Sequence, residues 1–495
     1  MMILALELQP PELYKHVHEL VRLSFPEYEI CQEIAADADI YLRISRIKSG
    51  PQLYLHAQLQ EGLRISRISC EYPLDMNGLQ EDHEISRLTR VFVYRLLCQH
   101  LGKNINPYGI LTGVRPLKLL HRWLDQGDSL EQILARLEQD FCLQPDVAER
   151  LAQIAGNNRP FLHSAREAKQ KISIYIGIPF CSSRCYYCSF PGAILTDYTV
   201  QMKPFLNSLR QEIEVMGECI NELGLKTENI YWGGGTPSIL AEDDLESLFN
   251  LLAQYRLTST VTETTVEAGR PDTLSKSKLE LLKALGVNRI CINPQTMQDT
   301  TLQLIGRGHS RTDIINMVQK VRDVGIPIIN MDLIIGLPGE GMAEYQNTLA
   351  QILELRPENI TVHSLAVKKG SRLAAAQGKK LMHELAGEVQ TGIHYIGRTL
   401  QEKEYQPYYL YRQKYMKANV ENIGYALPGR CCNYNIQMME ERQTIIGLGG
   451  GAGSKFVNPS DWSLTNLHSP KDPLAYTLHL PEQLARKVDK LKALN

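Results

Sequence analysis

The feature that most constrains this sequence is a regular alternation, from Lys171 to about residue 370, of short apolar runs and longer stretches with helical periodicity. Buried strands that alternate with helices form a parallel sheet with helices packed on it. Six such units are too few for a closed eight-stranded barrel, so we expect an open or partial barrel with its chemistry at the carboxyl ends of the strands. The predicted strands are Ser173–Ile178, Asn229–Trp232, Thr262–Glu267, Asn288–Ile292, Pro327–Leu333 and Asn359–Val362. The predicted helices are Gln201–Leu223, Asp243–Gln254, Ser275–Leu285, Arg311–Val324 and Ala343–Leu355.

The segments on either side of this alternation predict two further parts, so that we expect three domains: residues 1–165, 166–370 and 371–495. The first is an α+β accessory domain with paired strands at Ile40–Ile47 and Gln52–Leu59. Its predicted helices are Glu84–Leu101, Leu117–Leu124 and Leu130–Leu137. The last is an α/β region that caps the substrate site. It contains a helix at Lys380–Glu402, an aromatic stretch at Tyr405–Tyr415, a glycine-rich segment at Gly447–Phe456 and a closing helix from about Pro481.

Composition excludes several classes of protein. The 495 residues include 53 Lys and Arg against 55 Asp and Glu, a net charge of -2, which argues against a nucleic-acid coat and against an acidic solvating chain. The most apolar window, Ile326–Leu337, is broken by Asn330 and Asp332, so we expect no membrane span. The amino-terminal residues lack the basic segment of a signal peptide, and we expect a cytoplasmic protein.

Three of the eleven cysteines, Cys181, Cys185 and Cys188, are crowded into eight residues just after the first strand of the alternation. Three thiolates on one short loop can converge on a metal centre. A structural zinc site requires a fourth ligand, and no His or Cys follows closely. A [4Fe–4S] cluster normally takes four cysteines, so three would leave one iron open for another ligand. A chance group of core cysteines and a zinc site remain as the alternatives to a cluster.

The spacing CxxxCxxC, with Tyr187 directly before the last cysteine, resembles the radical S-adenosylmethionine (radical SAM) superfamily. The resemblance implies a [4Fe–4S] cluster whose open iron chelates the amino and carboxylate groups of SAM. It also implies that an electron from the cluster cleaves SAM to give a 5′-deoxyadenosyl radical, which abstracts hydrogen from an unactivated carbon. The partial, TIM-like (β/α)6 barrel of that superfamily agrees with the predicted strand count.

Further motifs follow in a fixed order: YxxxPFC, CxxxCxxC, GGGTP, VExxxP, a Gln followed by GRxH, and DLIxGLPG. This order, over roughly Ile172–Phe456, resembles the oxygen-independent coproporphyrinogen III oxidase (coproporphyrinogen dehydrogenase) family. GILTGVRP, YIGIPFC and PYYLYRQK point to its HemZ-type branch. The resemblance implies that SAM contacts Tyr175, Tyr187, Gly234, Gly235, Thr236, Glu267, Gln295, Arg307, Asp332 and Ala366. Two positions depart from the characterised oxidases, which have a histidine where this chain has Gly177 and a fourth cysteine where it has Phe190.

The resemblance implies a porphyrinogen substrate, whose two propionates would be decarboxylated to vinyl groups to give protoporphyrinogen IX in haem biosynthesis. Reduced flavodoxin or ferredoxin would donate the electron. The candidates for binding the substrate carboxylates are Lys368, Lys369, Arg372, Arg412, Lys414 and Lys455, with Tyr408, Tyr409 and Tyr411 as flat walls. The sequence carries no signal for an oligomeric state.

Two other functions fit the same motifs. The first is a haem chaperone of the HemW type, which shares a phenylalanine at the position of Phe190 and would use His309 or His363 as an iron ligand. The second is a radical SAM enzyme that acts on RNA, against which the composition of the accessory domain counts, because it is not notably basic.

Overall fold

The computed structural model describes residues 2–32, 38–74, 81–189, 192–366, 386–412 and 421–494. The contacts divide the chain into two compact units, residues 1–155 and 156–495. The division falls inside helix α5 (Pro145–Asn158), ahead of the boundary that the sequence predicted after residue 165. Phe190 and four of the predicted carboxylate-binding residues, Lys368, Lys369, Arg372 and Lys414, lie outside the described residues.

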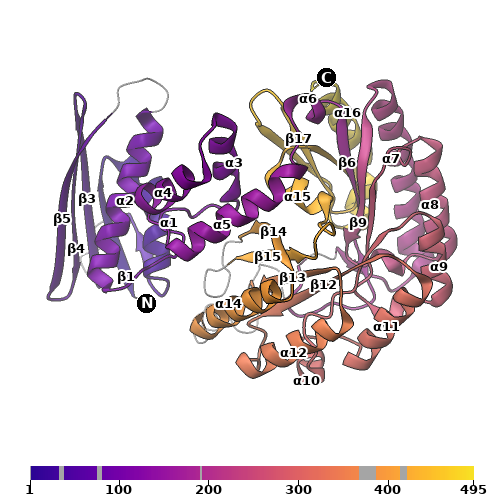
Figure 1. The fold of residues 1–495 in the computed structure, drawn as a ribbon. Coiled ribbons are helices and arrows are strands. Elements are labelled where there is room, and N and C mark those ends of the chain that lie inside the picture. Colours follow the sequence, from indigo (N-terminus) through magenta and orange to yellow (C-terminus); the bar gives the residue numbers. More distant parts are fainter. Residues whose placement is uncertain are drawn as a thin grey trace. The chain divides into compact units, whose positions relative to one another are not determined.

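The amino-terminal unit is built on a five-stranded sheet with strand order β2-β1-β3-β4-β5 (Figure 1). Strand β1 pairs in parallel with β2 and β3, whereas β3, β4 and β5 form an antiparallel meander. The strands are β1 (Ile3–Gln9), β2 (Glu29–Cys31), β3 (Ile40–Ser49), β4 (Gln52–Glu61) and β5 (Arg64–Pro73). The helices are α1 (Tyr14–Ser24), α2 (Glu81–Leu101), α3 (Leu117–Gln126) and α4 (Leu130–Phe141).

The core of this unit forms where α1 and α2 pack on one face of the sheet. Alternate residues of β4, from Leu53 to Leu59, are buried against α2 together with Phe92. A period of two in the burial of a strand is what a sheet covered on one face requires. The predicted strand pair and the three predicted helices are therefore present.

The carboxy-terminal unit contains one eleven-stranded sheet with the order β14-β15-β13-β12-β11-β10-β9-β6-β16-β17-β18. The six predicted strands lie next to one another and run parallel, as the alternation predicted. They are β6 (Lys171–Ile178), β9 (Lys226–Gly234), β10 (Glu263–Glu267), β11 (Arg289–Cys291), β12 (Ile328–Ile335) and β13 (Asn359–Ser364). The described sheet has edge strands at β14 and β18, so this α/β fold is a partial barrel.

Helices cover the outside of these parallel strands, and the loops that follow the strands gather at one end of the sheet (Figure 1). This arrangement is the usual consequence of repeated right-handed strand–helix–strand connections. The helices are α7 (Lys203–Glu222), α8 (Glu242–Gln254), α9 (Lys276–Ala284), α10 (Asp299–Leu304), α11 (Arg311–Val324) and α12 (Met342–Leu355). A short helix, α6 (Ala165–Ala168), precedes β6.

The carboxy-terminal segment extends the same sheet at both edges. Strand β16 (Thr444–Gly449) ends inside the glycine-rich segment; it pairs in parallel with β6 and adds a seventh parallel strand that the sequence did not predict. The aromatic stretch contains β14 (Gln406–Tyr411), which reaches β13 through β15 (Asn422–Ala426). The remaining elements are β17 (Gly453–Val457), β18 (Leu464–His468), α14 (Ala386–Glu402) and α15 (Asn433–Glu440).

The predicted start of the closing helix was wrong. Helix α16 (Pro473–Lys492) begins eight residues earlier, because Asp472 caps it by accepting a 2.8 Å hydrogen bond from the Ala475 N–H. Pro473 occupies the first helical position that the sequence analysis assigned to Pro481. Pro481 lies inside the helix.

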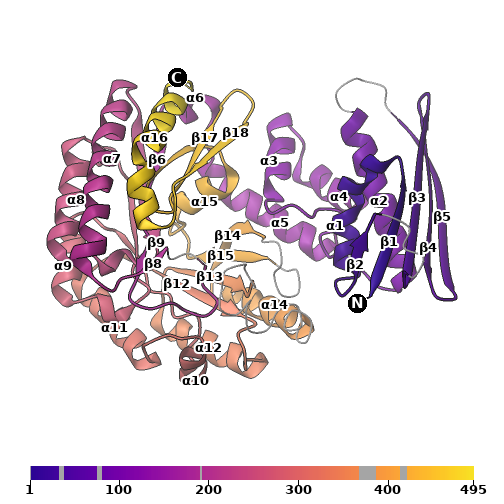
Figure 2. The ribbon, with the colours of Figure 1, turned by 180° about the vertical axis from the view of Figure 1, so that it is seen from behind.

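A buried ion pair connects α16 to the rest of the sheet. Lys487 and Glu212 on α7 are both fully buried, with Nζ and Oε1 2.6 Å apart. Lys487 also donates to the Gly447 carbonyl at 2.6 Å, and Glu212 accepts from the Gly449 N–H at 2.7 Å. Figure 2 shows α16 beside α7. The pair therefore holds both helices against the carboxyl end of β16.

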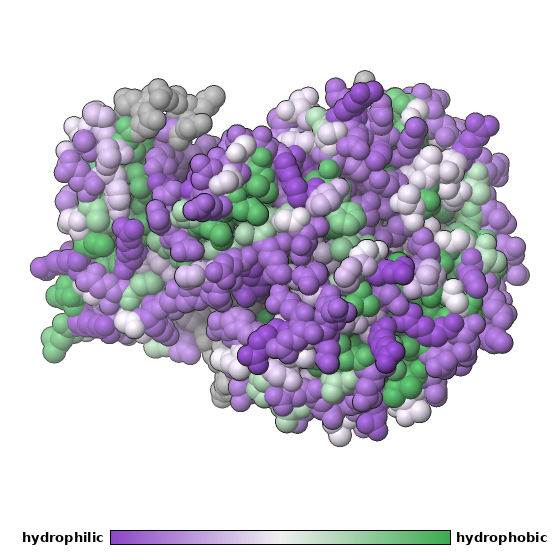
Figure 3. Space-filling model, in the orientation of Figure 1, coloured by the Kyte–Doolittle hydropathy of each residue, from purple (hydrophilic) through white to green (hydrophobic). Residues whose placement is uncertain are grey.

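No helix in the described part of the chain combines the length and the apolar character needed to cross a membrane. The face drawn in Figure 3 is covered mainly by hydrophilic residues, with apolar residues in scattered groups.

Replacing Lys487 with Met should destabilise the protein strongly, because Glu212 would remain buried without a counter-charge. Breaking a buried pair on one side typically costs about 3–5 kcal/mol. The loss is measured as a lower urea midpoint for unfolding of the cluster-free protein. Lys492→Met is the matched control on the same helix, because Lys492 and its partner Glu222 are more than half exposed, 52% and 65%, and the pair should contribute little. Equal midpoints for the two variants would contradict this role of Lys487.

Candidate functional site

A pocket of about 360 Å³ lies at the carboxyl ends of the parallel strands. All thirteen residues predicted for the cluster and for SAM line it, although they come from segments almost two hundred residues apart in the chain. They are Tyr175, Cys181, Cys185, Tyr187, Cys188, Gly234, Gly235, Thr236, Glu267, Gln295, Arg307, Asp332 and Ala366. Their convergence is the arrangement expected of strand-end residues in a parallel barrel.

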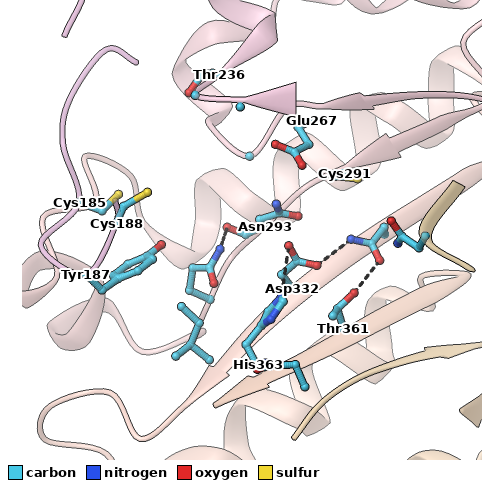
Figure 4. Close-up of a pocket in the computed structure, with 18 of the residues that line it drawn as sticks. Cys185, Tyr187, Cys188, Thr236, Glu267, Cys291, Asn293, Asp332, Thr361 and His363 are labelled. Atoms are coloured by element: carbon cyan, nitrogen blue, oxygen red, sulfur yellow. Dashed lines mark hydrogen bonds and ion pairs between the residues drawn. The ribbon is translucent and has the colours of Figure 1, made fainter. Parts of the chain in front are cut away.

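The cysteine loop follows β6 directly and borders the pocket. Cys181 lies 3.1 Å from the Thr236 hydroxyl, measured from Sγ to Oγ1, and Figure 4 shows the sulfur atoms of Cys185 and Cys188 close together at one end of the pocket. Burial raises the pKa of Cys181 to about 11, so the thiol is protonated near neutral pH. Coordination to a metal would deprotonate it. Among the described residues, no three His, Cys, Asp or Glu side chains are already placed to hold a metal ion.

The surroundings of the loop suit an anionic metal cluster. Arg270 and Arg307 are 5% and 9% exposed, and neither guanidinium forms an ion pair with a carboxylate among the described residues. A buried charge without a partner is costly, so these two cations fit a site that receives negative charge from outside the polypeptide. Three thiol ligands and two buried cations therefore fit a [4Fe–4S] cluster held by Cys181, Cys185 and Cys188.

Glycines allow the backbone to approach closely at two places beside the loop. A Cβ on Gly235 would lie 2.3 Å from the Phe180 carbonyl oxygen, and Gly234 has a φ of +106°. At Gly177, one of the two departures from the characterised oxidases, a Cβ would lie 2.6 Å from the Gly450 carbonyl oxygen. The turn after β16 therefore occupies the space that a histidine side chain at this position would need.

Two carboxylates face each other across the pocket with opposite shifts of their pKa values (Figure 4). Burial, with a smaller contribution from nearby Asp332, raises the pKa of Glu267 to about 7, although Tyr231 opposes the rise by donating a 2.8 Å hydrogen bond to Oε1. Burial opposes the ionisation of Asp332 as well. However, the contact with His363, 3.8 Å from Nε2 to Oδ2, and a 2.8 Å hydrogen bond from Asn330 bring its pKa below the usual value. Near neutral pH, Asp332 is therefore charged and Glu267 titrates.

Gln295 is held in an unusual backbone conformation at the pocket wall. Its φ is +70°, and its N–H and carbonyl form 2.9 Å hydrogen bonds with Asp332 and Ile334 of β12. The next residue, Thr296, donates a 2.5 Å hydrogen bond to Glu340, a buried carboxyl whose pKa burial raises to about 7. A left-handed conformation at a non-glycine residue is costly, and these contacts supply the restraint that maintains it.

Sequence reasoning missed several residues that line the pocket. Arg270 lies within the VExxxP motif, Tyr231 comes two residues before Gly233 on β9, and Asn330 comes two before Asp332 on β12. Because strand side chains on one face recur every second residue, the period could have indicated Asn330 from Asp332, but it gave no such signal for Tyr231, since Gly233 does not line the pocket. Asn293, Cys291 and Thr361 also border the pocket (Figure 4). No motif signalled them.

The residues predicted to contact a substrate are divided by the structure. Tyr409 and Tyr411 line the pocket with parallel rings, 6.4 Å between centroids. Tyr408 is buried on the opposite side of its strand, and Arg412 is also buried, at 5% exposed. Lys455 does not line the pocket. Its ammonium group instead forms a 3.0 Å ion pair with Glu441, which does not line the pocket either. The predicted role of Lys455 was therefore wrong.

The two candidate histidines also differ. His363 lines the pocket, and its Nδ1 lies 3.2 Å from the Tyr411 hydroxyl while Nε2 faces Asp332 (Figure 4). His309 is 9% exposed and does not line the pocket. Burial, together with the positive charges of Arg307 and Arg270, lowers the pKa of His309 to about 4, so the ring is neutral near pH 7.

Comparison with known proteins places the chain in a family. Residues 175–352 match the radical SAM superfamily. The chain is 34% identical over 486 residues to the oxygen-independent coproporphyrinogen-III oxidase-like protein HemZ of Bacillus subtilis (strain 168), with 97% of this chain and 96% of the relative covered. The chain belongs to the HemZ family of radical SAM proteins. Like the rest of the superfamily, it uses a [4Fe–4S] cluster and SAM.

Two other similarities cover smaller parts of the chain. The chain is 37% identical over 200 residues to the heme chaperone HemW of Bacillus subtilis (strain 168), which covers 40% of this chain and 51% of HemW. The structure of the radical SAM enzyme HemN, coproporphyrinogen III oxidase from Escherichia coli, superposes with a TM-score of 0.51 and 22% identity. This match covers 66% of this chain and 73% of HemN, and it shows a shared fold.

The affinity for SAM should fall as the pH decreases through about 7, because Glu267 loses the charge with which it would accept hydrogen bonds from SAM. Tyr231→Phe removes the hydrogen bond that restrains the pKa of Glu267, so the decline should move to higher pH. Titration calorimetry of the cluster-loaded protein across neutral pH measures both profiles.

Tyr405→Phe is the control for this measurement, because that hydroxyl donates to the Pro357 carbonyl outside the pocket. A wild-type affinity that does not change with pH, or identical profiles for Tyr231→Phe and Tyr405→Phe, would contradict the role of Glu267.

Proposed function

We propose that this protein is a radical SAM oxidoreductase that decarboxylates propionate side chains of a porphyrinogen, with coproporphyrinogen III as substrate and protoporphyrinogen IX as product. The observation that carries the proposal is the single pocket in which the residues predicted to bind the cluster and SAM meet an aromatic wall formed by Tyr409 and Tyr411. Similarity to HemZ along almost the whole chain supports the same reaction class.

Each end of the pocket has its own task. Cys181, Cys185 and Cys188 would hold the cluster, and Glu267 and Asp332 would orient SAM from opposite sides. When bound, the cluster and SAM supply the means to abstract a hydrogen atom from an unactivated carbon. The residues of the chain exclude water from the site of hydrogen abstraction and hold the reacting carbon within contact distance. Such positioning accounts for much of the rate acceleration in enzyme reactions.

The substrate end of the pocket suits a flat, carboxylated ligand. Tyr411 presents an aromatic face and a hydroxyl that is already in contact with His363, and Asn422 lies beside them. In each catalytic cycle, one propionate side chain loses a hydrogen atom, then carbon dioxide and one electron, and a vinyl group remains. We propose a reduced flavodoxin or ferredoxin as the electron donor and a one-electron carrier as the acceptor.

Similarity to HemW favours a second function, in which the same pocket carries haem. A carrier needs a free ligand for the haem iron. Both ring nitrogens of His363 face protein groups, Tyr411 and Asp332, and His309 does not border the pocket. These contacts support the enzyme in preference to the carrier.

Alanine at Cys181, Cys185 or Cys188 should abolish iron binding and SAM cleavage, because the two remaining thiolates would be too few to hold the cluster. Iron and sulfide analysis after anaerobic reconstitution, together with the yield of 5′-deoxyadenosine, measures both effects. Cys219→Ala on α7 is the control, because that buried thiol does not border the pocket. Stoichiometric zinc without iron in protein purified in the absence of oxygen would refute the cluster assignment.

Anaerobic incubation of the cluster-loaded protein with SAM, a reductant, an electron acceptor and coproporphyrinogen III should give protoporphyrinogen IX. Product analysis by mass spectrometry distinguishes the enzyme from the carrier. Tight haem binding that is lost in His363→Ala or His309→Ala, together with no decarboxylated product, would reverse the choice.

A further inference from the structure

Arg270 reaches from the loop after β10 to the cysteine loop and contacts it in three places. Nη1 donates to the Ser183 hydroxyl at 2.7 Å, and Nη2 donates to the Ser183 carbonyl at 2.7 Å and to the Cys185 sulfur at 3.3 Å. The guanidinium is thus oriented by a rigid fork of hydrogen bonds, which a lysine could not reproduce.

The charge of Arg270 has no carboxylate to balance it. The side chain is 5% exposed, and the described residues contain no acidic group that forms an ion pair with it. Arg307 repeats the pattern: its Nη1 donates to the Gly269 carbonyl at 2.8 Å, and Nη2 donates to the Tyr187 hydroxyl at 2.9 Å. Two buried cations beside three cysteines therefore depend on the cysteine site for negative charge.

Reduction of an iron–sulfur cluster adds negative charge to a group that thiolate ligands already make anionic. Net charge and hydrogen bonds to the sulfur atoms are two of the factors that set the reduction potential of such a cluster. A buried guanidinium that donates to a ligand sulfur acts through both factors, and it favours the reduced form.

We propose that Arg270 raises the reduction potential of the cluster by donating a hydrogen bond to the Cys185 sulfur and by placing a buried positive charge beside it. The proposal rests on the assignment of the cluster to the three cysteines under the proposed function. Arg307 supplies a second positive charge from the Tyr187 side. A raised potential brings reduction of the cluster within reach of a weaker electron donor, so Arg270 is a positioning and tuning residue rather than a ligand.

The test is a redox titration of the anaerobically reconstituted protein without SAM, followed by the electron paramagnetic resonance signal of the reduced cluster. Arg270→Gln should shift the midpoint potential to a more negative value. Arg270→Lys, which keeps the charge but loses the fork, should shift it in the same direction by less. The exposed Arg311, at the start of α11, gives the matched control Arg311→Gln, which should leave the potential unchanged.

The outcomes separate this proposal from the proposed function. Full cluster content in Arg270→Gln with the potential of the wild type would overturn the role of Arg270 and leave the cluster assignment intact. If Arg270→Gln holds no cluster, the potential of Arg270→Lys decides: a negative shift supports the proposal, and an unchanged value overturns it. Iron retained in the cysteine variants would instead overturn the cluster assignment itself.

Discussion

The buried ion pair between Lys487 and Glu212 is the interaction on which the pocket depends. It joins the last helix to α7 and binds the backbone of Gly447 and Gly449 at the end of β16. Through that strand it sets the position of β6, whose last residues lead directly into the cysteine loop. The close contact of Gly177 with the Gly450 carbonyl is possible because β16 is fixed in this register. The cysteine loop is therefore supported by residues near the end of the chain.

The pocket combines buried groups of both signs. Glu267 and Asp332 face its centre, while Arg270 and Arg307 approach the cysteine loop. The carboxylates are restrained by neutral or weakly basic partners, and the guanidiniums are restrained by carbonyl, hydroxyl and thiol groups. Because the opposite charges are not neutralised by each other, they remain available to a cluster and to a zwitterionic cofactor. This arrangement is typical of a functional site whose buried charges are balanced by a bound group.

Much of the fold was predictable because its signals are local. Alternating periodicity located all six strands of the partial barrel and the helices between them except the short α10, and the motif spacing identified thirteen residues that line one pocket. The predictions failed where long-range contacts decide. The residues Thr444 to Ile446 of β16 are typical strand formers, but nothing in them shows that the strand joins the parallel sheet, since its place there depends on pairing with β6, far away in the sequence. The start of α16 was missed for a different reason, because the local signal was misread: Asp472 followed by Pro473 is a cap and a first helical proline, whereas Pro481 has no capping residue before it.

The sequence by itself determined the strand–helix alternation, the three cysteines and the order of the motifs, because hydrophobic period and residue spacing are properties of neighbouring residues. The tertiary structure decided which charged side chains face the pocket. It placed Arg270 on the Cys185 sulfur, paired Lys455 with Glu441 away from the pocket, and connected Tyr411 through His363 to Asp332. These contacts join separate strands and loops, and they exist because the sheet brings distant segments together. A side chain's partner, unlike its periodicity, depends on the packing of the whole unit.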